Sequence, residues 1–178
     1  VTTGPNRFAL VIEDPEIKTA PGVRFSVVGS STTSTANVRK IDGLWVAELG
    51  DLAAGPQHQY TVTLDSGVVI GPVPFYAGRK EQDSFSFAAF GDTRTGHDVH
   101  RALVLAIARE NVDFVVHSGD IVETGGVKSQ WERFFQIEGP LMSKSLLLPA
   151  IGNHDTSPRQ YFSRYFLFEQ YNEGRRYY

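Results

Sequence analysis

Three short apolar segments in the second half of the chain each lead into a glycine that is followed by Asp or Asn. The segments are residues 84–90, 112–117 and 146–151, and the pairs are Gly91-Asp92, Gly119-Asp120 and Gly152-Asn153. Two stretches with helical spacing of apolar residues, 97–110 and 128–138, lie between them. Strands that are apolar almost throughout and that alternate with helices are typical of an α/β layer built on a buried parallel sheet.

The first predicted helix has apolar residues at the spacing of one helix face. This predicted buried face consists of Val99, Ala102, Leu103, Ala106 and Ile107. Thr95 and Asp98 resemble a capping box at the start of the helix, with Asp in place of the usual Glu. His100 then falls on the polar face, where we expect it to be solvated. His97 is expected at the surface as well, and the alternative is that it faces the crevice of the site.

The later helices are rich in aromatic residues. In 128–138 we assign Trp131, Phe134 and Phe135 to the core, and a third helix is predicted to start at Ser157-Pro158. Residues 161–178 hold eight of the 21 aromatic residues of the chain. A domain seldom ends in so much apolar surface, so we expect the chain to be a piece of a longer protein.

The first 83 residues follow a different pattern, in which apolar and polar residues alternate with period two between turn residues. Asp42-Gly43 between residues 38–41 and 44–49 is a strong hairpin signal. About six short strands with no helical stretch between them predict an antiparallel β-sandwich. We therefore predict two domains, 1–83 and 84–178, joined by the charged stretch 78–83.

The three polar residues at the strand ends are predicted to meet. In an open α/β sheet, ligands bind beyond the carboxyl ends of the strands, and the intervals of 28 and 33 residues between Asp92, Asp120 and Asn153 each fit one βαβ unit. Two carboxylates and a carboxamide at one point would hold a cation such as manganese, iron or zinc. The alternative is that each Asp caps the loop after its strand, and three such pairs in register favour the metal site.

These motifs resemble a known family. The stretches 91–94 (GDTR), 119–125 (GDIVETG) and 152–155 (GNHD) look like the first three motifs of the calcineurin-like metallophosphoesterases, in order and at similar spacing. The predicted sandwich is similar to the fibronectin-III-like domain that precedes the catalytic domain of purple acid phosphatases. The resemblance implies a β-sandwich followed by a partial α/β metallophosphoesterase layer.

The resemblance also implies a role for each motif residue. Asp92 would bind the first of two metal ions, Asp120 would bridge both, and Asn153 would bind the second. His154 would stand beside the phosphoryl group, and Asp155 would orient it. The metal ions would be manganese, iron or zinc, and the reaction would be the hydrolysis of a phosphomonoester or phosphodiester by a metal-activated water.

The sequence departs from the family pattern in two places. Arg94 occupies the position of a histidine ligand, and because a guanidinium cannot coordinate a cation we expect Arg94 to contact the substrate phosphate. The alternative for Arg94 is a surface ion pair. No histidine follows Asp155, so the later histidine motifs are missing and the chain alone is expected to be inactive.

Other features limit the function classes. The chain has no cysteine, which excludes disulfides and thiolate metal sites, and its net charge of -3 gives no nucleic-acid signature. No apolar run approaches the roughly 18 residues of a membrane span, and no signal peptide is present in this chain. We expect a small phosphate ester as substrate and, by the resemblance alone, a secreted or periplasmic location. The alternative is a non-catalytic extracellular binding module with a degenerate phosphoesterase domain; the oligomeric state is left open.

Three further side chains carry weaker expectations. Glu123 follows Asp120 closely and is either a support to the site or an exposed loop carboxylate. His117 lies in a predicted strand, where a buried hydrogen-bonded role is at least as well supported as a contact with the site. His58 has no partner that the sequence suggests.

Overall fold

The computed structural model describes residues 2–4, 7–78, 80, 84–156 and 160–167. Contacts between residues divide the chain into two units, Val1–Ser84 and Phe85–Tyr178. Most of the predicted linker, 78–83, lies outside the described residues, as does the predicted helix start at Ser157-Pro158.

The first unit consists of two four-stranded antiparallel sheets. One contains β1 (Thr2–Gly4), β2 (Arg7–Ile12), β6 (Leu44–Leu49) and β5 (Asn37–Ile41), and the other contains β4 (Ser34–Thr35), β3 (Gly22–Val27), β7 (Gln57–Thr63) and β8 (Val69–Tyr76). Side chains from both sheets form one core, including Val23, Leu49, Val62 and Phe75. The predicted β-sandwich is confirmed, whereas its fibronectin-III-like character stays a prediction.

The hairpin predicted at Asp42-Gly43 joins β5 to β6. Both turn residues have positive φ, 47° and 82°, as a two-residue hairpin turn requires. The turn sets the register, so that Ile41 pairs with Leu44, and β6 buries Leu44, Val46, Ala47 and Leu49, whereas no residue of β5 is fully buried.

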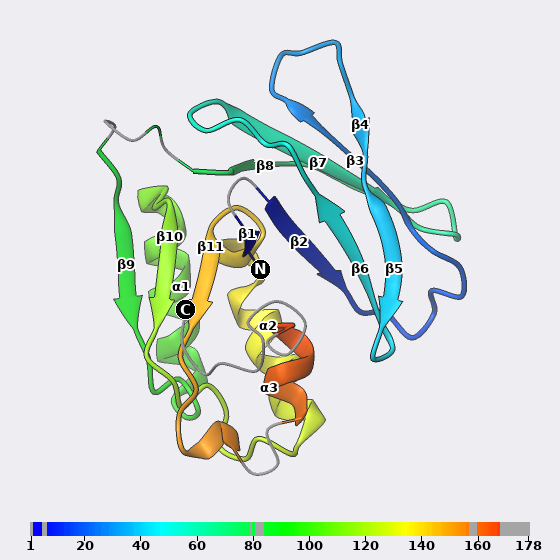
Figure 1. Ribbon diagram of the computed structural model, residues 1–178. Coiled ribbons are helices and arrows are strands. Elements are labelled where there is room, and N and C mark those ends of the chain that lie inside the picture. Colours follow the sequence, from blue (N-terminus) through cyan, green and yellow to red (C-terminus); the bar gives the residue numbers. More distant parts are fainter. Residues whose placement is uncertain (1, 5–6, 79, 81–83, 157–159, 168–178) are drawn as a thin grey trace. The chain divides into compact units, whose positions relative to one another are not determined.

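The second unit is an α/β layer. Its parallel sheet has the order β11 (Leu146–Pro149), β10 (Phe114–His117) and β9 (Phe87–Phe90). Its helices are α1 (His97–Glu110), α2 (Lys128–Met142) and α3 (Gln160–Tyr165), with a 3-10 turn at His154–Thr156. Figure 1 shows α1 and α2 side by side behind the sheet. The predicted partial α/β layer is confirmed.

The two faces of this sheet differ in exposure. Val115, His117, Leu147 and Pro149 are buried, because they belong to the face that α1 and α2 cover. Residues of the other face are partly open, and Phe87 is 54% exposed although it stacks on Phe114. Parallel strands are usually covered on both faces, which explains why all these strands are apolar throughout.

The details predicted for α1 are wrong, although its bounds are correct. The residue before the helix is Gly96 in the left-handed conformation, and no side chain caps the helix, so Thr95 and Asp98 form no capping box. The buried residues of α1 are His100 and Val104, whereas Val99 is 75% exposed. This face packs against α2, where His100 Nε2 lies 2.7 Å from Oε1 of the buried Glu138.

An aromatic cluster joins α2 to α3. Trp131 is fully buried and its ring contacts those of Phe162, Tyr165 and Phe166. The indole N–H donates to the carbonyl of Gly125 at 2.9 Å, which fixes the loop before α2. The assignment of Trp131 and Phe134 to the core is correct, and Phe135 is partly buried.

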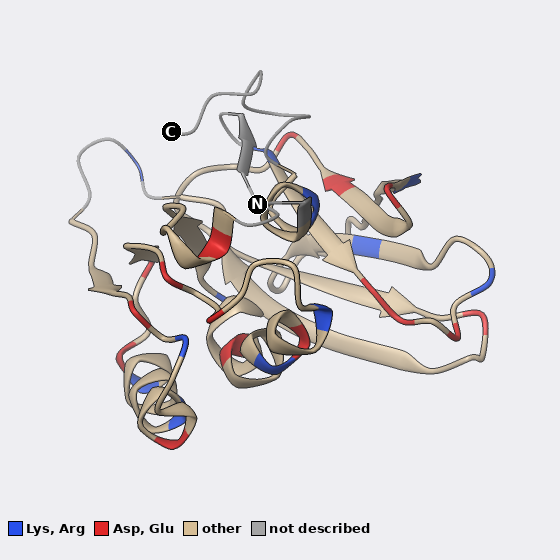
Figure 2. Ribbon diagram, turned by 90° about the horizontal axis from the view of Figure 1, so that it is seen from below, with Lys and Arg blue, Asp and Glu red and all other residues tan. Residues whose placement is uncertain are grey.

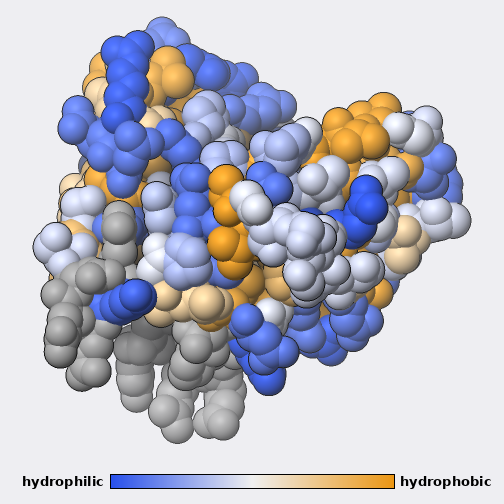
Figure 3. Space-filling model, turned by 90° about the horizontal axis from the view of Figure 1, so that it is seen from above, coloured by the Kyte–Doolittle hydropathy of each residue, from blue (hydrophilic) through white to orange (hydrophobic). Residues whose placement is uncertain are grey.

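The surface carries charges of both signs. Figure 2 shows acidic and basic residues interspersed along the ribbon, and Figure 3 shows apolar residues in several separate groups among hydrophilic ones. One exposed apolar group is Val68, Val69 and Ile70 at the β7–β8 hairpin. Within the described parts of the chain, no helix has the length and apolar character to cross a membrane.

Candidate active site

The sheet register brings the three motif loops to one edge. Phe90, His117 and Pro149, the last residues of their strands, are aligned. The loops that follow pack closely: a Cβ on Gly119 would lie 2.6 Å from the amide nitrogen of Gly152. The glycines are therefore needed where neighbouring loops touch, as well as for the turns themselves.

Asp92 and Asp120 share an unusual backbone conformation. Their φ angles are 55° and 53°, in the left-handed region that Asp adopts more readily than most residues. The amide of Asp92 donates to the carbonyl of Gly119 at 3.0 Å, which ties the two loops together. Such backbone strain at two adjacent strand ends is typical of functional sites.

His117 connects the loops beneath these carboxylates. The amide N–H of Gly119 donates to Nδ1 of His117 at 3.2 Å, so the ring proton is on Nε2. Nε2–H then donates to Oγ1 of Thr93 at 3.0 Å, and the Thr93 hydroxyl donates to the carbonyl of Ile121 at 3.3 Å. Burial is the main reason that the pKa of His117 is lowered from 6.5 to about 4. His117 is thus a buried, hydrogen-bonded residue.

Asp155 holds the second and third loops together. Its carboxylate accepts hydrogen bonds from the backbone amides of Ile121 and Val122, at 2.9 and 3.1 Å, and from that of Gly152 at 2.9 Å. The side chain is fully buried, and this burial raises its pKa above the usual value, although the three amides lower it. Within the described structure its partners are backbone amides, so Asp155 would orient His154 through the loop.

The guanidinium of Arg94 lies among three carboxylates. Nε of Arg94 is 2.7 Å from Oδ1 of Asp92 and 4.0 Å from Oδ2 of Asp120, and one terminal nitrogen is 3.6 Å from Oε2 of Glu123. The hydrogen bond to Asp92 is the main reason that the pKa of Arg94 is raised. The ion pair that was the alternative for Arg94 is thus present, with the Arg94 side chain only 28% exposed and facing two of the predicted metal ligands, whereas its contact with a substrate phosphate stays a prediction.

His154 lies next to Arg94. A terminal nitrogen of Arg94 is 2.5 Å from Nε2 of His154, and because a guanidinium only donates, Nε2 is the acceptor. Nδ1–H of His154 donates to the carbonyl of Glu123 at 2.8 Å. The backbone N–H of His154 donates to Oδ1 of Asp120 at 3.2 Å. These contacts place the ring proton on Nδ1 and leave Nε2 as the acceptor that faces the guanidinium.

Asn153 lies beside these groups in sequence, and its side chain is exposed. Its carbonyl accepts a hydrogen bond from the hydroxyl of Thr156 at 2.7 Å, which stabilises the turn. In the described chain its carboxamide has no hydrogen-bond partner, so the structure brings together Asp92, Asp120, Arg94 and His154 and leaves Asn153 at the rim.

The carboxylates of Asp92 and Asp120 are the type of ligand that a metal ion binds. Among the described residues, no group of three Asp, Glu or His side chains is close enough to enclose a metal ion. Asp92 and Asp120 nevertheless lie near enough to share one guanidinium, so two carboxylates here already attract a positive charge. Hard oxygen donors of this type bind manganese, iron or zinc.

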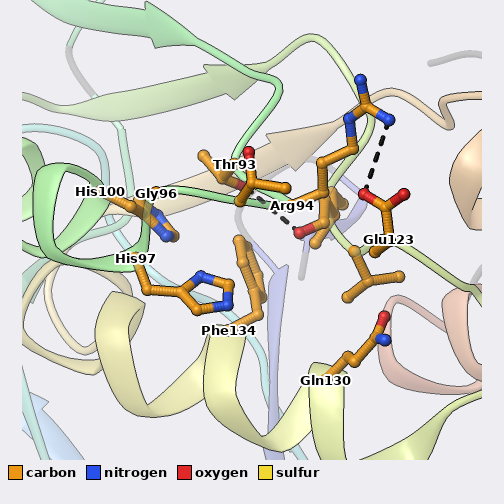
Figure 4. Close-up of a pocket in the computed structure, with 11 residues that line it drawn as sticks. Thr93, Arg94, Gly96, His97, His100, Glu123, Gln130 and Phe134 are labelled. Carbon is orange, nitrogen blue, oxygen red and sulfur yellow. Dashed lines mark hydrogen bonds and ion pairs between the residues drawn. The ribbon is translucent and has the colours of Figure 1, made fainter.

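A cavity of about 370 Å³ adjoins Arg94 and Glu123. Figure 4 shows the Arg94 guanidinium and the Glu123 carboxylate at one side of it, and the rings of His97 and Phe134 with Gln130 at the other. His100 also lines the cavity.

The sequence argument left one feature of this region open and missed another. Glu123 supports both Arg94 and His154, a role left open beside plain exposure. The buried pair of His100 and Glu138 was not foreseen, because His100 was assigned to the surface. Helical spacing places Glu138 on the same face as Trp131 and Phe134, so an acidic residue on an apolar face was the available signal.

Comparisons with known proteins agree with this geometry. The family model for calcineurin-like phosphoesterases matches residues 85–178, more than half of the chain. The chain belongs to the calcineurin-like phosphoesterase family.

A purple acid phosphatase, PPD1 from seeds of yellow lupin (Lupinus luteus), matches with a TM-score of 0.67 and 18% sequence identity, over 86% of this chain and 34% of that chain. This similarity shows a shared fold, and the chain spans about a third of the length of the lupin protein. A Bacteroides vulgatus structure assigned to the glycoside hydrolases has a TM-score of only 0.25 at 11% identity, over 64% of this chain and 27% of that chain. No curated protein sequence matches significantly.

Proposed function

We propose that the protein hydrolyses phosphate esters, at a dinuclear metal centre to which Asp92, Asp120 and Asn153 contribute. The observation that carries the proposal is the pair of carboxylates, Asp92 and Asp120, held in left-handed conformations at adjacent strand ends and facing one guanidinium. Family membership supports hydrolysis of phosphate esters in general. When bound, the metal ions supply an activated water and neutralise charge on the phosphoryl group.

The side chains of this chain then have distinct tasks. Arg94 binds phosphoryl oxygens, for which its planar fork is suited, and in doing so withdraws its N–H groups from Nε2 of His154. Nε2 then becomes free to take up a proton from the solvent and to deliver that proton to the leaving oxygen. The carbonyl of Glu123 keeps the other ring nitrogen protonated and fixes the ring. Asp155 keeps the loops that carry Asp120 and His154 in place.

Three finer points belong to the same proposal. The metal ions are manganese, iron or zinc, the substrate is a small phosphomonoester or phosphodiester, and the location is secreted or periplasmic. The first two follow from the oxygen donors and the family, and the third rests only on the resemblance to purple acid phosphatases. Metal analysis, paired substrates and cell fractionation test them separately.

The decisive experiment uses the product of the whole gene, because the chain covers about a third of the lupin phosphatase. We expect manganese- or iron-dependent turnover of p-nitrophenyl phosphate or of its bis ester, and stoichiometric metal by elemental analysis. Asp120→Ala should abolish metal retention and turnover, whereas Asp98→Ala, a matched change at an exposed residue of α1, should alter neither. Absence of both turnover and bound metal in the wild type would refute the proposal.

A further inference from the structure

The cavity beside Arg94 contains ring nitrogens that lack partners. Nδ1 of His97 and Nδ1 of His100 are both buried and make no hydrogen bond within the described structure. His100 is only 4% exposed, and both residues line the cavity. Three residues apart on α1, they lie on one face of the helix. Buried polar atoms are almost always paired, so these nitrogens call for a partner that enters the cavity.

The cavity adjoins the proposed phosphate-binding residue, Arg94. Arg94 and Glu123 line it, and Arg94 also contacts Asp92, a predicted metal ligand. An ester whose phosphoryl group is held by Arg94 would therefore place its alcohol part in the cavity. The volume of about 370 Å³ lies within the range of small-molecule sites, roughly 300–1,000 Å³.

The protonation pattern selects the chemistry of that alcohol. Nε2 of His100 lies 2.7 Å from Oε1 of the buried Glu138, so Nδ1 is the ring nitrogen left to face a ligand, as an acceptor or as a donor according to the tautomer of the ring. A hydroxyl group both donates and accepts, and it satisfies Nδ1 in either case. An alkyl or phenyl group would leave both nitrogens unpaired, which is costly in a buried place.

We propose that this cavity is a leaving-group site that selects a polyhydroxylated alcohol, such as that of a sugar phosphate, through His97 and His100. Ile121, Val122 and Phe134 form apolar walls against which the carbon skeleton packs. This inference rests on the proposed phosphate-ester hydrolysis. It adds a selectivity that the motif residues alone do not supply.

The test compares two esters with similar ring size, glucose 6-phosphate and cyclohexylmethyl phosphate, with the product of the whole gene and manganese. We expect kcat/KM to favour glucose 6-phosphate by about tenfold or more, as two or more hydrogen bonds would give. His97→Phe keeps a ring but removes the nitrogens, and should reduce that preference about three- to tenfold. Val99→Ala, an exposed residue two positions along α1, should leave it unchanged.

A second readout does not depend on turnover. Glucose 6-phosphate should shift the imidazole NMR signals of His97 and His100, whereas cyclohexylmethyl phosphate should shift them little. Equal kcat/KM for the two esters, with unshifted imidazole signals and active p-nitrophenyl phosphate hydrolysis, would overturn this inference alone and assign the cavity to water. No turnover of any of the three esters would overturn the proposed function, and with it the leaving-group assignment.

Discussion

Protonation of His117 should destabilise the α/β unit in a narrow pH range. The ring is fully buried and neutral, with Nδ1 accepting from Gly119 and Nε2–H donating to Thr93. Acid adds a proton to Nδ1, which then faces the N–H of Gly119 and loses its hydrogen bond. The pKa is about 4 in the folded protein and 6.5 without the fold, so the unfolded chain takes up the proton first.

The size of the effect follows from that difference. The stability that neutral His117 contributes is fully present above pH 6.5 and is lost as the pH falls toward 4, at about 1.4 kcal/mol per pH unit. Between pH 7 and pH 5 the loss is about 2 kcal/mol, and it reaches about 3 kcal/mol below pH 4. Against a typical total of about 5–15 kcal/mol, this is a large fraction.

Urea unfolding at pH 7, 6 and 5 measures this loss in the free energy of unfolding. His117→Gln keeps an N–H that can reach Thr93 but does not titrate. The pH dependence of its free energy of unfolding therefore lacks the contribution of His117, while all other groups titrate as in the wild type. A Trp45→Phe background lets fluorescence report the buried Trp131 of the same unit. If the free energies of unfolding of wild type and His117→Gln fall by the same amount between pH 7 and 5, the account of His117 is wrong.

Three other residues give further predictions. Asp155→Ala leaves three backbone amides without their acceptor and should lower the free energy of unfolding by about 3 kcal/mol or more, measured by urea unfolding at pH 7. Arg94→Ala should raise KM for p-nitrophenyl phosphate about tenfold to a hundredfold in the whole gene product, with Asp98→Ala as the unchanged control. Asp65 has a lowered pKa because the amides of Lys18 and Thr19 donate to it, so the stabilisation by its carboxylate is present above about pH 4 and is lost below. In Asp65→Asn the melting temperature should therefore depend less on pH between pH 5 and 3 than in the wild type, measured by thermal unfolding.

The fold was largely predictable because its signals are local. Period-two alternation, the Asp42-Gly43 turn and the apolar parallel strands each depend on residues near in sequence, and the bounds of α1 follow from its apolar spacing. The buried face of α1 could not be predicted in this way. That face includes the contact of His100 with Glu138, which is 38 residues away in sequence, so no pattern within α1 reveals it.

In the candidate site, too, local sequence patterns predict some features and long-range contacts determine the others. Convergence of Asp92 and Asp120 follows from the rule that parallel strands end at one edge, and glycine before each Asp marks the turn. The contacts of Arg94 depend on side-chain directions across three loops, which no local pattern encodes. Glu123 is the clearest example of what the sequence could not predict. A loop carboxylate near a metal motif looks the same in sequence whether it is solvated or paired. Only the fold shows that the Glu123 carboxylate faces Arg94 and that its backbone carbonyl accepts from His154.

The charges around Arg94 explain why this arrangement favours a cation. Asp92, Asp120 and Glu123 face one guanidinium, so negative charge is in excess even after Arg94 is counted. The charge of Asp120 also helps to raise the pKa of Asp155. Arg94 reduces this repulsion without filling the site, since the side chain of Asp92 stays 69% exposed. A cation bound by the carboxylates of Asp92 and Asp120 would lower this repulsion further.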